Sequence, residues 1–224
     1  MHLVLGVTHH QLRTRQSVIE LITSRNIQFH VWAVHNPAFI QPVKFSNEDD
    51  RTTLMRVLLD VHPMIRCGPE TRVIPKILDF RREWSVGRES ERLKAAGLYP
   101  DVIDSAVRSF ILSLIINAGE TSPVLCNKDP LSFIHLEYMA KIFPDAKFIH
   151  MVRDGRAVIN SLVKRNADID GIPKETDDRF HAWEIRVSQF IQACNAIGST
   201  RCMTIKYESL VLQPAEVLQT LFNI

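Results

Sequence analysis

The feature that most constrains this 224-residue chain is the alternation of short apolar segments with helical patterns from residue 52 onward. Apolar residues at helical spacing predict helices at residues 52–61, 101–118, 132–143, 156–165 and 178–197, and a last helix that begins near Pro214. Short apolar runs that stop in polar turns predict strands at residues 123–130, 146–152 and 202–207. Because strands that alternate with helices are typical of parallel sheets, we predict an α/β fold in which helices flank a parallel sheet.

Composition and charge narrow the class of protein. Hydrophobic residues make up 46% of the chain, which is enough for one sizeable core. The formal net charge of +2 gives no sign of a nucleic-acid binder or of a polybasic membrane-surface protein. Residues 29–43 are uncharged, but they contain two prolines and fall short of the roughly 20 apolar residues that a bilayer span needs. We expect one domain at residues 46–224, no membrane-spanning helix and no nucleic-acid partner, and we assign no structure to residues 1–45.

The four cysteines leave three interpretations open. Cys67, Cys126, Cys194 and Cys202 could be free thiols, ligands of a metal ion, or two disulfides. The chain contains no C-x-x-C pair and no H-E-x-x-H motif, so the spacing argues against a zinc site. Buried free thiols are then the simplest interpretation.

A candidate anion site follows the strand predicted at residues 146–152. Open α/β sheets bind ligands at the carboxyl ends of their strands, where helix N-termini present N–H groups to anions. Arg153 stands at the strand exit, and Ser161 and Arg165 are four residues apart on the next predicted helix, so they share a face. Two guanidinium groups and a hydroxyl could hold a phosphate. A solvated helix with surface arginines is the alternative.

A second candidate pair follows two of the cysteines. Glu70 lies three residues after Cys67, and Lys128 lies two residues after Cys126. A bridge between the two cysteines would bring Glu70 and Lys128 together. A carboxylate that acts as a base beside an ammonium that neutralises a leaving oxygen is a minimal pair for group transfer. A purely structural ion pair is the alternative.

Five short motifs follow one another in a fixed order along the chain. They are Thr52-Thr53-Leu54-Met55-Arg56, Cys67-Gly68-Pro69-Glu70-Thr71-Arg72-Val73-Ile74-Pro75, Cys126-Asn127-Lys128-Asp129-Pro130, residues 148–156 and residues 202–210. The ordered set, within residues 51–221, resembles the protein-tyrosine sulfotransferases. The resemblance implies a P-loop-like sulfotransferase fold and transfer of a sulfuryl group from 3′-phosphoadenosine 5′-phosphosulfate (PAPS) to tyrosine hydroxyls, without a metal.

The resemblance also assigns roles to individual residues. Glu70 matches the family's catalytic base, and Lys128 matches the residue that stabilises charge on the sulfuryl and leaving oxygens. The positions that match donor contacts are Arg51, Thr52, Thr53, Arg153, Ser161, Arg165 and Tyr207. The segment that matches the substrate-peptide contacts consists of Arg72, Val73, Ile74, Pro75 and Lys76.

The same resemblance sets expectations for partners and compartment. Substrates would be proteins with tyrosines in acidic contexts, since Arg72 and Lys76 offer local positive charge. The family's disulfides correspond to Cys67 with Cys126 and Cys194 with Cys202, which fits an oxidising compartment such as the Golgi lumen. A homodimer is also implied.

Three features depart from the family pattern. The family's 5′-phosphosulfate loop reads Arg-Ser-Gly-Thr-Thr, whereas this chain reads Asp49-Asp50-Arg51-Thr52-Thr53. The family also continues beyond the end of this chain, and its N-terminal membrane anchor and stem have no counterpart here. We therefore expect a C-terminally truncated domain, and a non-catalytic relative that binds peptides or dimerises is the alternative to an enzyme.

Overall fold

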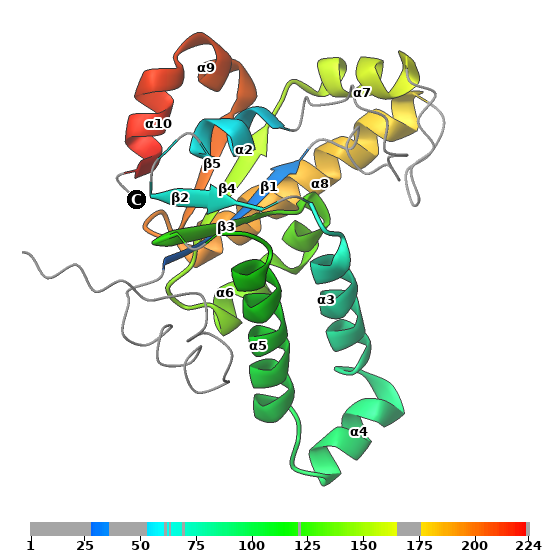
Figure 1. Ribbon diagram of the computed structural model, residues 1–224. Helices are drawn as coiled ribbons and strands as arrows, with labels where there is room; N and C mark the ends of the chain where they lie inside the picture. The colour runs from blue at the N-terminus through cyan, green and yellow to red at the C-terminus, as the bar shows by residue number, and fades with distance from the viewer. Residues whose placement is uncertain are drawn as a thin grey trace, which may run out of the picture.

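The computed structural model describes residues 28–35, 53–60, 62, 64–68, 70–120, 122–164 and 176–222. Its centre is a five-stranded sheet in the order β2-β3-β1-β4-β5, in which every neighbouring pair is parallel (Figure 1). The strands are β1 (Gln28–His35), β2 (Ile65–Cys67), β3 (Val124–Lys128), β4 (Lys147–Val152) and β5 (Cys202–Lys206). The predicted parallel α/β fold is therefore confirmed.

Helices connect the strands and cover the sheet. They are α2 (Thr53–Asp60), α3 (Val73–Glu83), α4 (Gly87–Ala95), α5 (Asp101–Asn117), α6 (Leu136–Ile142), α7 (Gly155–Lys164), α8 (Thr176–Ile197), α9 (Tyr207–Leu212) and α10 (Pro214–Phe222). The helix predicted at residues 132–143 is instead a 3₁₀ helix, Pro130–His135, followed by α6, and proline suits a first helical position because no N–H is needed there. Within the described ranges no helix is long and apolar enough to cross a membrane.

Strand β1 comes from the segment to which the sequence assigned no structure. It lies between β3 and β4, and its register places Trp32 beside both Lys128 and Ile149. Aromatic and β-branched residues such as Phe29 and Val31 favour extended structure. The central strand of the sheet is thus supplied by residues 28–35.

Two hydrophobic cores lie on opposite faces of the sheet. Residues of β4 alternate between them, because successive side chains of a strand point to opposite faces. Phe148 packs with residues of α3, α5, α6 and α8, whereas Ile149 and Met151 pack with residues of α2, α9 and α10. Burial on both faces is the usual condition of a parallel sheet.

A disulfide between Cys194 and Cys202 joins the end of α8 to the start of β5. The turn between them depends on Gly198, whose φ of 96° is a conformation that side chains rarely adopt. Its N–H donates to the carbonyl of Cys194, and its own carbonyl accepts from the N–H of Cys202. This is one of the two disulfides that the resemblance implied.

The long helices α3 and α5 extend together from the sheet, with α4 at their far end (Figure 1). A polar cluster joins the C-terminal end of α3 and the first turn of α5 to α6: Asp104 accepts hydrogen bonds from Arg81 at 2.8 Å, Tyr138 at 2.9 Å and Lys141 at 2.9 Å. Burial opposes ionisation of Asp104, but these hydrogen bonds hold the pKa of its carboxyl below the usual range. The cluster therefore ties the end of α3 that is remote from the sheet to α5 and α6.

Candidate active site at the carboxyl ends of the strands

The carboxyl ends of the parallel strands meet at one edge of the sheet, and four candidate residues gather there. Glu70 follows β2, Lys128 is the last residue of β3, Arg153 follows β4, and Tyr207 follows β5. Each comes from a different strand, so the sheet topology rather than sequence proximity groups them. This edge is where open α/β folds place their ligands.

Glu70 and Lys128 form a close ion pair. The register pairs Cys67 with Cys126, whose Cα atoms are 4.5 Å apart, and a disulfide joins them. Beyond this bridge, Lys128 Nζ donates to Glu70 Oε2 at 2.8 Å. The two residues lie together, as the sequence predicted for bridged cysteines.

The surroundings of the pair suit proton transfer. The side chain of Lys128 is 7% exposed and that of Glu70 is 20% exposed, so the ammonium is buried while the carboxylate reaches the surface. Glu70 Oε1 also lies 3.6 Å from Arg72 Nε. A partly exposed carboxylate beside two fixed cations can accept a proton from a bound hydroxyl, and the cations can neutralise charge that develops nearby.

Asp129 is a further acid at this edge, to which the sequence assigned no role. Its side chain is fully buried, and Oδ2 accepts a hydrogen bond from the backbone N–H of Arg72 at 3.0 Å. Burial raises the pKa of its carboxyl to about 7, and the charge of Glu70 adds to the rise. The signal in the sequence was a carboxylate placed between a buried strand and a proline, which is an unusual position for a solvated acid.

Arg153 and Tyr207 meet at the neighbouring strand ends. The guanidinium carbon of Arg153 lies 4.8 Å from the centre of the Tyr207 ring, within the range of a cation–π contact. The backbone N–H of Asp154 donates to Glu208 Oε1 at 2.9 Å, which ties the start of α7 to the start of α9. These contacts bring Arg153 to the N-terminus of α7, where anions are favoured.

The remaining predicted donor residues are only partly described. Thr53 is the first residue of α2, and Ser161 lies half-buried in α7. Arg51, Thr52 and Arg165 lie outside the described residues, as do Asp49 and Asp50. The shared helix face expected for Ser161 and Arg165 therefore stays a prediction.

The predicted substrate-peptide segment divides into inner and outer residues. Ile74 and Pro75 are buried at the start of α3, where Ile74 joins the core between α3 and α5. Val73 is 40% exposed, Lys76 is exposed, and the side chain of Arg72 is 35% exposed. Only these three side chains can meet a peptide on the surface, while the other two support the segment.

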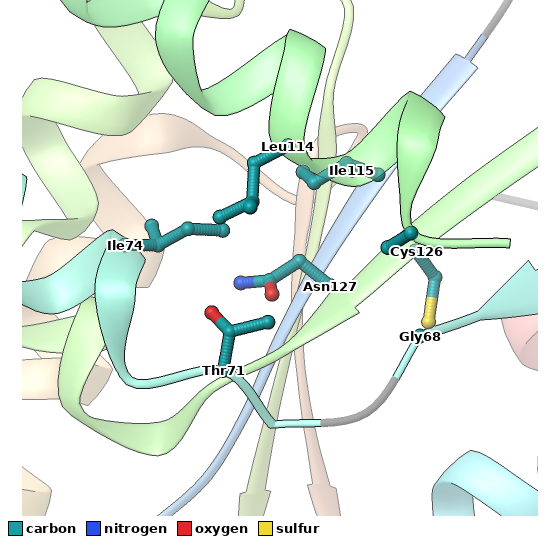
Figure 2. A pocket seen from close by; sticks show the side chains of 8 residues that line it. Gly68, Thr71, Ile74, Leu114, Ile115, Cys126 and Asn127 are labelled. Atoms are coloured by element: carbon teal, nitrogen blue, oxygen red, sulfur yellow. The ribbon is translucent and has the colours of Figure 1, made fainter.

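A small pocket lies between the segment that leads into α3, the end of α5 and β3 (Figure 2). Its lining consists of Gly68, Thr71, Ile74, Leu114, Ile115, Ala118, Cys126 and Asn127. Thr71 and Asn127 supply its polar side chains and lie next to each other in Figure 2. None of these lining residues has an ionisable side chain, since Cys126 is in a disulfide.

A family model described as the sulfotransferase family matches residues 52–224. The chain is 45% identical to protein-tyrosine sulfotransferase 1 of Danio rerio over 174 residues, which are 77% of this chain and 49% of that protein. It is 36% identical to protein-tyrosine sulfotransferase 2 of Gallus gallus over 224 residues, or 99% of this chain and 59% of that protein. The chain thus spans about half the length of these curated relatives.

Solved structures show the same fold at low sequence identity. The sulfotransferase domain from the curacin biosynthetic pathway matches with a TM-score of 0.56 and 19% identity, over 88% of this chain and 72% of that one. The sulfotransferase from Alicyclobacillus acidocaldarius matches with a TM-score of 0.51 and 14% identity, over 87% of this chain and 78% of that one. The predicted sulfotransferase fold is confirmed.

Proposed function

Because this chain belongs to the sulfotransferase family, we propose that it transfers a sulfuryl group from PAPS to the hydroxyl of tyrosines in proteins. The observation that carries the proposal is the 2.8 Å contact between Lys128 and Glu70 at the carboxyl edge of the sheet. The similarity to proteins named protein-tyrosine sulfotransferases supports the choice of a tyrosine acceptor. As in phosphoryl transfer, such a reaction depends mostly on positioning and on fixed positive charge.

In this proposal Glu70 is the general base. A tyrosine hydroxyl has a pKa of about 10, so it needs a proton acceptor in order to attack at neutral pH. The carboxylate of Glu70 is partly exposed and is held in place by Lys128 and Arg72. It takes the phenolic proton as the phenol oxygen bonds to sulfur.

Lys128 stabilises the charge that the transfer moves. The bond between sulfur and the bridging phosphate oxygen of the donor breaks as the new sulfur–oxygen bond forms, and 3′-phosphoadenosine 5′-phosphate leaves with the electron pair. A buried ammonium that is already in place stabilises those oxygens without reorganising. The proton ends on Glu70, so atoms and charge balance.

The donor would lie against the strand ends and the helix starts. Arg153 and Tyr207 are already packed together at the N-terminus of α7, which suits a phosphate group. Ser161 lies on the same helix, and the proposal includes Thr53 at the start of α2. Arg51, Thr52 and Arg165 complete the proposed donor contacts on the basis of their match to the family motifs.

The exposed residues of the peptide segment support the proposal that substrates carry acidic residues around the tyrosine. Arg72 places positive charge 3.6 Å from Glu70, Lys76 adds an exposed cation in the first turn of α3, and Val73 adds an exposed apolar side chain. Carboxylates that flank a tyrosine would pair with these cations and orient the hydroxyl toward Glu70.

We further propose that the protein acts in the Golgi lumen as a homodimer. Two disulfides fit an oxidising compartment. Light scattering of the purified protein tests the dimer, and microscopy of the full-length protein with a Golgi marker tests the compartment.

A second candidate function is that of a non-catalytic relative that binds peptides. The sequence Asp49-Asp50-Arg51 favours it, because two carboxylates stand where the family's donor loop carries arginine and serine. Like charges about 4 Å apart at an effective dielectric constant of about 20 repel by about 4 kcal/mol. Repulsion of that size between these carboxylates and the donor's phosphosulfate would oppose its binding.

One set of measurements separates the two functions. The oxidised protein is titrated with 3′-phosphoadenosine 5′-phosphate and assayed for sulfate transfer to an acidic tyrosine peptide. We expect activity that is lost in Glu70→Gln and Lys128→Met but kept in Glu137→Gln, a control at an exposed glutamate of α6.

A donor-loop variant completes the experiment. Absence of binding and activity in the parent, with both restored by Asp49→Arg/Asp50→Ser/Arg51→Gly, would favour the non-catalytic relative. Absence of activity in both proteins would refute the proposed enzyme.

A further inference from the structure

The segment that carries Glu70 is attached to β3 at two points. The first is the disulfide between Cys67 and Cys126. The second is the hydrogen bond from the backbone N–H of Arg72 to Asp129 Oδ2, at 3.0 Å. Glu70 lies between these two attachments, and its partner Lys128 lies between their anchors on the other strand. The disulfide holds the start of the segment, and the hydrogen bond to Asp129 holds its backbone just before α3 begins.

The backbone at the second attachment is strained. Arg72 has φ 55° and ψ 5°, and it is the one non-glycine residue with positive φ in the described ranges. This left-handed conformation brings Cβ too close to the backbone, so side chains other than glycine adopt it only where their surroundings hold them there. The hydrogen bond that Arg72 donates to Asp129 is positioned to hold this conformation, since its donor is the N–H of the strained residue itself.

This turn decides where two side chains of the site point. It separates Glu70 from the first residue of α3, Val73, so a change in the Arg72 backbone would redirect both Glu70 and the Arg72 side chain. Glu70 must reach Lys128 with one oxygen while the other lies 3.6 Å from Arg72 Nε. Small displacements of such groups are costly in reactions that depend on alignment.

The environment of Asp129 suits a permanent attachment. The residue is fully buried and directly follows Lys128 in the chain. Burial and the charge of Glu70 raise the pKa of its carboxyl to about 7, while the hydrogen bond from Arg72 works in the opposite direction. Both the neutral and the ionised carboxyl have an oxygen that accepts from an N–H, so the attachment survives protonation.

We infer that Asp129 is a positioning residue, which sets the direction from which Glu70 meets Lys128 and the tyrosine by holding the backbone of Arg72. Asp129 touches no reacting atom in this scheme and acts through Glu70 and Arg72. The inference rests on the proposed sulfate transfer, because alignment of Glu70 matters only if it acts as the base.

The test compares Asp129→Ala with Asp129→Asn. The alanine removes the acceptor, whereas the amide oxygen of asparagine still accepts from the Arg72 N–H and lacks the charge. Asp145→Ala, at an exposed site, is the control. Four quantities are measured: kcat and KM for an acidic tyrosine peptide, affinity for 3′-phosphoadenosine 5′-phosphate, and the rate of hydrogen exchange of the Arg72 amide.

We expect Asp129→Ala to lower kcat at least about tenfold with donor-product affinity unchanged, and Asp129→Asn to stay within about threefold of the parent. The Arg72 amide should exchange at least about tenfold faster in Asp129→Ala alone. Parent-like kcat in Asp129→Ala would overturn the inference, as would equal losses in both variants.

The experiment also separates the two proposals. A parent protein that transfers no sulfate refutes the proposed function, and hydrogen exchange at Arg72 then tests the attachment by itself. Equal exchange in the parent and in Asp129→Ala would show that Asp129 does not hold the turn. Should Asp129→Ala not fold, Asp129→Asn remains decisive, because a large loss of kcat in that variant contradicts a role as hydrogen-bond acceptor.

Discussion

The two disulfides should contribute very different amounts to the free energy of unfolding. Cys67 and Cys126 are 59 residues apart in the chain, whereas Cys194 and Cys202 are 8 apart. In the chain-entropy relation, closing the longer loop stabilises the fold by about 4.2 kcal/mol and closing the shorter one by about 2.5 kcal/mol. The expected difference is about 1.8 kcal/mol.

The comparison uses two double variants, Cys67→Ala/Cys126→Ala and Cys194→Ala/Cys202→Ala. All four sulfurs are in buried residues, so the packing lost on truncation is similar in both variants and largely cancels in the difference. Urea unfolding at 25 °C, followed by circular dichroism and extrapolated linearly, gives the two free energies. We also expect a larger rise in m, the slope of the free energy of unfolding against urea concentration, for the first variant, because a longer loop is released in its unfolded chain.

The same variants separate stability from site geometry. Where both variants remain folded, the loss of the Cys67–Cys126 bridge should reduce sulfate transfer more, since of the two disulfides only this one lies beside the Glu70 and Lys128 pair. Equal losses of unfolding free energy, or a larger loss for the short loop, would refute the loop-length reasoning.

Three further predictions concern buried groups. Burial lowers the pKa of His150 from 6.5 to about 4, so as the pH falls the unfolded chain binds a proton before the folded chain does. The free energy of unfolding should therefore drop by about 3 kcal/mol between pH 6.5 and pH 4. His150→Phe should flatten this pH dependence when it is measured by urea unfolding. Gly155→Ala should destabilise the fold by about 1–3 kcal/mol, although alanine has a better helix propensity than glycine, because the new Cβ would lie 2.8 Å from the Trp183 ring. A higher Tm for this variant would contradict the prediction. Asp104→Ala should lower the free energy of unfolding by about 3–5 kcal/mol, because it leaves the buried guanidinium of Arg81 without its ion-pair partner. Lys141→Met, at the exposed partner of Asp104, should lower it by at most about 1 kcal/mol. Equal losses for the two variants in urea unfolding would count against the reasoning.

Contiguous patterns accounted for most of the elements. The helices α5 and α8 and the strands β3 and β4 were predicted within a few residues of their observed ends, because their apolar periodicity lies within one continuous segment. The short helix α9 was missed because it begins at Tyr207, directly where β5 ends, and six residues carry little periodic signal. Helix α3 was missed as well, since it follows the strained turn at Arg72.

The candidate site could be predicted in part for the same reason. Glu70 and Lys128 follow cysteines in recognisable turns, so a bridge between those cysteines already implied their proximity. Arg153 and Tyr207 were expected at strand ends, but their contact with each other required the pairing of β4 with β5. The contact of Asp129 with the Arg72 backbone could not be predicted from neighbouring residues, where the only indication was an acidic residue beside a proline.

The sequence by itself determined the α/β class and the residues that would stand at the ends of the strands, because both follow from patterns of neighbouring residues. Only the tertiary structure decided that residues 28–35 form the central strand and that Asp129 holds the turn at Arg72. Strand order and hydrogen bonds between distant residues depend on packing across the sheet. Those contacts join residues that the chain alone leaves far apart.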